Sequence, residues 1–259
     1  MLIFLLRLLN SQRREVPVKK RTPFNWSLLD RNILYSMLYK LGPQLIGKEL
    51  EIPVLHSILA THIKKHLPIK VVRVHELITE SKLVYTGGTY YSDNDQEHRR
   101  QLEIVFSYHT TDKTIKITRY RWQRMCQLFA DTMLHEIIHM RQYRSREFKQ
   151  LDGYESTAQM AKQRKDQSYY GHPDELGAYA FNIACELFDK FGNDLQSIKH
   201  YLDSNLAIRK KKTCYYRYLL AFEWNHQHII IKKLKRKILV QLKNAATGKP
   251  FKTTNHLTY

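Results

Sequence analysis

The sequence predicts an α+β protein in which a small, mainly antiparallel sheet packs against a pair of site helices. Three observations predict this class. Segments rich in Val, Ile and Tyr occur between residues 69 and 120. Runs free of Pro and Gly, with apolar residues at helical spacing, lie on both sides of them. Further helical segments occur at the N-terminal side and in a basic C-terminal region, and 259 residues are enough to bury a sizeable core.

The first 24 residues form an apolar segment, Met1–Leu9, followed by a basic linker that contains Pro17 and Pro23. The apolar run is interrupted by Arg7 and is much shorter than the roughly 20 residues of a membrane-spanning helix. Positive charges follow it instead of preceding it, unlike a signal peptide. We therefore expect no membrane attachment.

Local patterns then predict the order of the elements. Helices are expected over Trp26–Lys40 and Leu55–His66. The segments with the strongest strand pattern are Ile69–Val74, Lys82–Thr86, Glu103–Tyr108 and Thr114–Tyr120. Gly87-Gly88 and residues 91–100 are expected to form a loop, and Thr110–Lys113 a hairpin turn. A helix of about twenty residues, from near Arg121 to Tyr143, should follow the sheet.

The most informative motif, His135-Glu136-Ile-Ile-His139, lies on this last helix. Histidines four residues apart on a helix point the same way, so both imidazoles can reach one metal ion. The adjacent Glu136 can then act as general base toward an activated water. The alternative interpretation is an amphipathic helix with two incidental histidines.

A catalytic zinc ion needs a third protein ligand, and the segment after Gly171 offers three candidates. Pro173 suits the first turn of a helix that we expect to continue to about Phe191. Glu175, in this first turn, is the favoured ligand, although an acid at this position is also typical of ordinary helix starts. His172 is the alternative third ligand and Asp174 the next choice.

The pair HEIIH and DELGAYA resembles the gluzincin-type zinc metallopeptidases over roughly residues 70–190. The resemblance implies a zincin-type pair of active-site helices, with His135, His139 and Glu175 as zinc ligands and Glu136 as general base. The same stretch is similar to small predicted peptidases of bacteriophages. The order of strand, Gly-Gly, strand and helix is more weakly similar to SprT-like proteases, but no third histidine follows the motif before His172.

Peptide hydrolysis also needs a donor for the developing oxyanion and a surface that holds the substrate. Residues 144–172 join the two site helices and are expected to form a wall or lid of the cleft. Candidate donors are Tyr154, Tyr169, Tyr170, Tyr179 and His172, among which the sequence does not choose. Thr114–Tyr120 is the candidate strand for pairing with an extended substrate, with an interior strand as the alternative. Asp131, four residues before His135, is a candidate for orienting a ligand.

The formal charge of +19 indicates an acidic partner. Residues 209–259 carry 13 Lys or Arg and one acid, with aromatic residues interleaved. Such a region can bind nucleic acid, or it can form basic helices that pack through their aromatic residues. The candidate nucleic-acid contacts are Arg209, Lys210, Lys211, Lys212, Lys232, Lys233, Lys235, Arg236 and Lys237.

Together these patterns predict a zinc metallopeptidase with residues 25–192 as catalytic domain and 193–259 as a basic helical extension. Its expected partners are a protein or peptide substrate and, as a candidate, nucleic acid. The alternative is a zinc-stabilised nucleic-acid-binding protein without hydrolytic activity. Three widely spaced cysteines without a Cys-x-x-Cys pair favour a reducing, cytoplasmic location, or the host cytoplasm for a viral protein.

Overall fold

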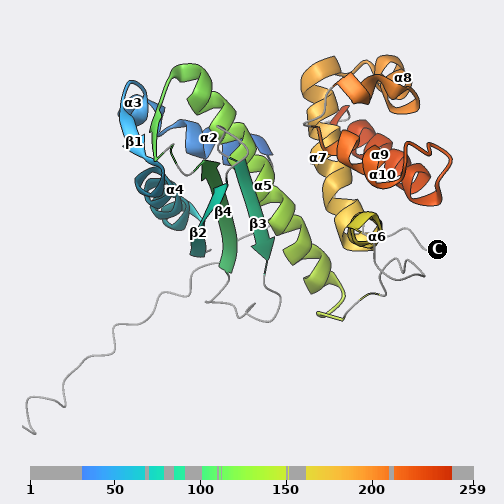
Figure 1. Ribbon diagram of the computed structural model, residues 1–259, viewed down its shortest axis with the longest axis horizontal. Coiled ribbons are helices and arrows are strands. Elements are labelled where there is room, and N and C mark those ends of the chain that lie inside the picture. The colour runs from blue at the N-terminus through green and yellow to red at the C-terminus, as the bar shows by residue number, and fades with distance from the viewer. Residues whose placement is uncertain are drawn as a thin grey trace, which may run out of the picture.

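The computed structural model describes residues 31–67, 70–78, 85–90, 101–109, 111, 113–149, 151, 162–209 and 213–246 (Figure 1). It confirms the α+β class. The N-terminal part contains α2 (Arg31–Tyr39), α3 (Gly42–Leu45), β1 (Glu49–Glu51) and α4 (Ile52–His66). The strands β2 (Lys70–Ile78), β3 (Tyr85–Tyr90), β4 (Gln101–His109) and β5 (Thr114–Lys116) come next. The remaining elements are α5 (Arg119–Ser145), α6 (Lys162–Gly171), α7 (Pro173–Phe191), α8 (Leu195–Asp203), η3 (Asn205–Arg209), α9 (Cys214–Ala221) and α10 (Ile229–Ala246).

Two small sheets are present among the described residues. The larger has the strand order β2-β4-β3, in which β4 runs parallel to β2 and antiparallel to β3. The smaller pairs β1 with β5 in antiparallel register. Side chains of β4 alternate, so that Leu102, Ile104, Phe106 and Tyr108 are buried on one face. Two of the three strand pairings are therefore antiparallel, as the sequence predicts.

The long helix α5 lies between the three-stranded sheet and the C-terminal helices (Figure 1). It begins where the Thr118 hydroxyl accepts a hydrogen bond from the Arg121 N–H. Helix α7 packs beside α5 and begins at Pro173, the residue type that suits a first helical position. Gly192, with φ of 58°, ends α7. Both site helices therefore match their expected bounds to within about two residues.

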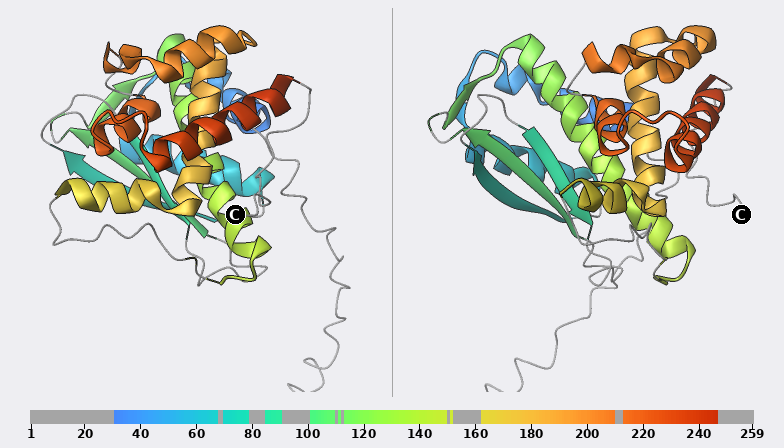
Figure 2. Two further views of the ribbon diagram at one scale, coloured as in Figure 1. Left: turned by 90° about the vertical axis from the view of Figure 1, so that its right-hand side faces the viewer. Right: turned by 45° about the vertical axis from the view of Figure 1, so that its right-hand side comes forward.

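Two hydrophobic clusters hold the described part of the chain together, and α7 contributes to both. Its residues Ala178, Phe181 and Cys185 join the cluster that contains α2, α4, α5 and the sheet. On another face, Leu176, Ile183 and their neighbours pack against α8, α9 and α10. The C-terminal helices thus share a core with α7, and the turned views in Figure 2 show them beside this helix. The proposed division near residue 192 stays a prediction.

Several strand predictions are wrong. The residues Gly87 and Gly88 lie within β3, not in a loop. The strands β4 and β5 form no hairpin, because β2 and β3 occupy both edges of β4 and β5 pairs with β1 instead. The segment Thr114–Tyr120 is a strand only as far as Lys116, and Arg119 already begins α5.

The N-terminal predictions lie partly outside the described residues. The apolar segment Met1–Leu9, the linker and the first five residues of the helix expected from Trp26 lie outside them. In the part of the chain that the structure describes, no helix combines the length and apolar character needed to cross a bilayer. Cys126, Cys185 and Cys214 are free thiols.

Candidate metal centre

His135, His139 and Glu175 come together between α5 and α7 and could hold a metal ion, since one ligand atom of each lies within 4.8 Å of the others. The two Nε2 atoms face each other at 3.1 Å. One Glu175 carboxylate oxygen lies 3.4 Å from the His135 Nε2, and the other lies 3.4 Å from the His139 Nε2. Glu175 Oε2 is buried and has no hydrogen-bond partner among the described residues. This convergence is the arrangement that a shared cation requires.

The electrostatics of the cluster also favour a cation. Burial alone raises the pKa of the Glu175 carboxyl, but the adjacent imidazoles of His135 and His139 together outweigh burial and lower the pKa below its ordinary value. Burial opposes a charge on His139, yet its contacts with Glu175 raise the pKa of its imidazole. The carboxylate therefore stays ionised, and positive charge is stabilised between these side chains.

Side-chain amides hold both imidazoles through their Nδ1 atoms. Gln142 Oε1 lies 3.0 Å from the His139 Nδ1, so an Nδ1–H donates to it and leaves Nε2 as a free lone pair. The Asn182 amide lies 3.3 Å from the His135 Nδ1, and its buried oxygen has no hydrogen-bond partner in the described residues. If the Asn182 amide is turned so that its oxygen faces the His135 Nδ1, this oxygen accepts a hydrogen bond from an Nδ1–H. The lone pair of His135 is then on Nε2, which faces the His139 Nε2.

Glu136 lies beside the cluster and is 5% exposed. Burial raises the pKa of its carboxyl, while the neighbouring imidazoles oppose this shift. The backbone N–H of Tyr90 donates a hydrogen bond to the carboxylate, which links Glu136 to β3. A Cβ atom on Gly88 would lie 2.8 Å from the Glu136 Cγ and 3.1 Å from the Thr132 Cγ2. Glycine at position 88 therefore lets the edge strand β3 approach the general-base candidate.

This geometry corrects the strand proposed for substrate pairing. Thr114–Tyr120 contributes three residues to the separate β1–β5 sheet. β3 is instead the edge strand of the larger sheet, and it packs directly on α5. Sequence reasoning missed this edge strand because Gly87-Gly88 is more typical of a loop. The close approach of Gly88 to α5 is the signal that a glycine inside a strand can indicate.

The alternative ligands have other contacts. His172 is the N-cap of α7, and its Nδ1 accepts a hydrogen bond from the Asp174 N–H at 3.3 Å. Asp174 forms a bidentate ion pair with Arg146, at 2.7 and 2.6 Å. Asp131 pairs with Arg31 at 2.6 Å instead of orienting a ligand histidine. The candidate metal set therefore consists of His135, His139 and Glu175.

Four tyrosines come from α6, α7 and α9 to the Glu175 side of the cluster. Tyr169 hydrogen-bonds to both the Glu175 carboxylate and Tyr179, and 46% of its surface is exposed. The ring of Tyr179 packs edge-on against His135, with 4.7 Å between ring centroids. Tyr170 and Tyr218 pack behind Tyr179, at 5.4 and 5.5 Å. Tyr154, another oxyanion-donor candidate from the sequence, lies outside the described residues.

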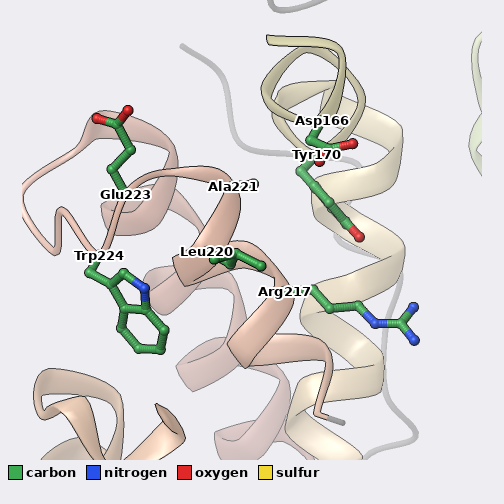
Figure 3. Close-up of a pocket in the computed structure, with 7 residues that line it drawn as sticks. All are labelled: Asp166, Tyr170, Arg217, Leu220, Ala221, Glu223 and Trp224. Atoms are coloured by element: carbon green, nitrogen blue, oxygen red, sulfur yellow. The ribbon is translucent and has the colours of Figure 1, made fainter. Parts of the chain in front are cut away.

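A pocket lies beside this tyrosine group, and its lining includes none of the three candidate metal ligands. The pocket lies between α6 and α9 and has a volume of ≈ 520 Å³. Figure 3 shows the residues that line it. Its lining residues are Asp166, Tyr170, Arg217, Leu220, Ala221, Glu223 and Trp224. Tyr170 in its lining contacts Tyr179, whose ring packs against His135.

The basic C-terminal residues divide into several groups. Lys232 and Arg236 are exposed on α10, and Lys233 is partly buried. Lys235 pairs with Asp203 at 2.7 Å. Lys237 is partly buried, and this burial lowers the pKa of its ammonium although Asp174 opposes the shift. Lys210, Lys211 and Lys212 lie outside the described residues, as does the side chain of Arg209.

Comparison of the chain with known protein families, with curated protein sequences and with solved structures finds no match. The geometry of the site is therefore the basis for any functional inference.

Proposed function

We propose that the protein is a zinc-dependent metallopeptidase. The spacing of the three donor groups carries this proposal. Ligand atoms about 2.0–2.1 Å from a tetrahedral zinc ion are roughly 3.3 Å apart. The His135–His139, His135–Glu175 and His139–Glu175 donor distances are 3.1, 3.4 and 3.4 Å. Two imidazoles and one carboxylate are also a common donor set of catalytic zinc.

The residues beside the donors support hydrolysis over a purely structural ion. A zinc ion bound there supplies a Lewis acid that polarises the scissile carbonyl and lowers the pKa of water. Glu136 is not among the three donors, yet its carboxylate adjoins them and is desolvated. Its raised pKa suits a group that accepts a proton from the attacking water and passes it to the leaving amine.

The edge of β3 is the proposed substrate-binding element. Gly87 and Thr89 are exposed on this strand, and β3 pairs with β4 on one side. Its backbone N–H at Tyr90 already binds Glu136. The other edge of β3 has no strand partner among the described residues. An extended peptide that pairs with this edge would lie alongside the general base, through main-chain hydrogen bonds with little regard for sequence. The expected substrate class is therefore an extended segment of a protein or peptide.

Tyr169 is the proposed oxyanion donor. Its hydroxyl reaches Glu175 while nearly half of the residue is exposed, so it lies at the border between the metal cluster and solvent. Tyr179 is held between His135, Tyr170 and Tyr218, which leaves less freedom for its hydroxyl. A phenolic O–H that turns from Glu175 to the reacting carbonyl would stabilise the developing charge.

Metal content and peptide hydrolysis together test this function. We expect about one zinc ion per wild-type chain and a large loss in Glu175→Ala. Glu136→Gln should keep the metal and lower the hydrolysis of an unfolded protein substrate by at least about 10²-fold. Elemental analysis and cleavage of a quenched fluorescent casein give the two readouts.

The chain offers a matched control for the metal measurement. His62 and His66 on α4 repeat the four-residue spacing, with ring centroids 4.5 Å apart, but no third ligand joins them among the described residues. His62→Ala with His66→Ala should leave the zinc content unchanged, and so should His172→Ala. Zinc without hydrolysis in the wild type would favour the alternative of a metal-stabilised binding protein. Zinc retained in Glu175→Ala would contradict the assigned donor set.

A further inference from the structure

A second group of basic residues lies at the beginning of α5. Tyr120 is 76% exposed, more than any other large apolar side chain in the described part of the chain. Arg119 and Arg121 flank it in sequence, and Arg124 follows one turn later. All three arginines are exposed. Tyr120 and Arg124, four residues apart, share the outer face of the helix.

These arginines form few hydrogen bonds with the rest of the described chain. Arg121 donates to the Lys116 carbonyl, and Arg124 donates to the Gln127 amide oxygen. None of the three forms an ion pair with a described residue, although Arg124 lies within electrostatic reach of Asp131. Their guanidinium groups are therefore available to an external partner.

The same arrangement is unfavourable for the helix itself. The first turn of α5 contains no acidic residue. Cations at this end of a helix interact unfavourably with the helix dipole. Exposure of the Tyr120 ring also leaves its apolar surface in water. Neither feature stabilises the folded chain, so both point to a role in binding.

The chemistry of this surface suits one class of partner. Guanidinium groups form strong, paired hydrogen bonds with phosphate oxygens. An exposed aromatic ring stacks on a nucleobase only when the base is unpaired. We propose that Arg119, Tyr120, Arg121 and Arg124 form a binding surface for single-stranded nucleic acid. This proposal goes beyond the peptidase function and does not depend on it.

The surface also differs from the basic helix α10. Lys235 on α10 is paired with Asp203, and Lys237 is partly buried. The described residues of α10 include no aromatic side chain. Lys232 and Arg236 are exposed, but α10 itself supplies no aromatic ring for stacking. α10 can therefore attract a polyanion, whereas the start of α5 can also distinguish unpaired bases.

Binding of a short fluorescent oligothymidylate to the full chain, followed by anisotropy over a series of salt concentrations, tests the proposal. Tyr120→Ala should weaken binding about tenfold without changing the slope of affinity against salt, and Tyr120→Trp should retain it. Arg121→Gln with Arg124→Gln should reduce this slope by roughly 0.7 for each arginine. Thermal unfolding should show these variants to be at least as stable as the wild type.

Lys232→Gln with Arg236→Gln removes the same charge from α10 and is the matched control. It should change binding less than the arginine pair does. An equal loss in this control, a wild-type preference for duplex of the same length, or unchanged binding in Tyr120→Ala would each overturn the proposal.

Discussion

Arg31 on α2 and Asp131 on α5 form an ion pair across one hundred positions of sequence, with Nε–Oδ1 and Nη2–Oδ2 distances of 2.6 and 3.2 Å. The same guanidinium binds both carboxylate oxygens of Asp189 on α7 at 2.8 Å. Arg31 thereby joins the two helices that carry the metal ligands, at a point one turn before His135. Burial raises the pKa of Asp131, and the charge of Arg31 opposes that shift.

Replacement of Arg31 by Met should destabilise the fold by about 1–3 kcal/mol, because it leaves the partly buried Asp131 carboxylate without its partner. Urea unfolding measures the loss. The control is Lys235→Met, whose partner Asp203 is 71% exposed, and which should cost at most about 1 kcal/mol. Equal costs for the two substitutions would show that the Arg31 pair contributes no more than a surface ion pair.

Gly88→Ala should impair hydrolysis while the metal content stays unchanged. The added Cβ would meet Glu136, so either β3 or the carboxylate must shift, at a cost of about 1–3 kcal/mol. A displaced base should lower kcat/KM by about tenfold or more. In the adjacent Gly87→Ala control, the Cβ would meet only the Val105 Cβ, at 3.9 Å. Similar kinetic effects of the two substitutions would argue against a specific contact between Gly88 and Glu136.

Tyr169→Phe tests the oxyanion donor. Loss of the hydroxyl should lower kcat by about 10²-fold and leave KM and zinc content nearly unchanged, because the interaction forms in the transition state. Steady-state kinetics and elemental analysis measure these effects. Tyr170→Phe is the control, since that neighbouring side chain lines the pocket between α6 and α9. A rise in KM alone, or a loss of zinc, would instead assign Tyr169 to substrate binding or to support of Glu175.

Glu186 should make stability depend on pH. Burial raises the pKa of its carboxyl from 4.5 to about 7, although hydrogen bonds from Cys214 oppose the shift. The folded protein therefore keeps a proton that the unfolded chain releases, so the free energy of unfolding falls as pH rises from 4.5 to 7. The total decrease in the free energy of unfolding is at most about 3 kcal/mol, and it is complete once the pH exceeds the pKa of Glu186 in the folded protein.

The substitution Glu186→Gln should flatten that dependence, because an amide does not titrate in this range. Urea unfolding of the wild type and the variant at several pH values isolates the contribution of Glu186. Curves that stay parallel from pH 4.5 to 7 would contradict the raised pKa.

Local patterns in the sequence were enough to predict the two site helices and the metal motif. The bounds of α5 and α7 follow from unbroken helical periodicity, the Pro173 start and the glycine after Phe191. The shared direction of His135 and His139 follows from four-residue spacing on one helix. These features depend on neighbours in sequence, and for this reason they could be derived without the fold.

Contacts between distant segments were decided only by the tertiary structure. Glu175, His172 and Asp174 are adjacent in sequence, but only packing of α7 on α5 turns Glu175 toward the histidines while Arg146 engages Asp174. The strand order that brings Gly88 against Glu136 likewise depends on pairing between segments far apart in the chain. Helical periodicity is a local property of the backbone, whereas these contacts exist only after distant surfaces are buried together.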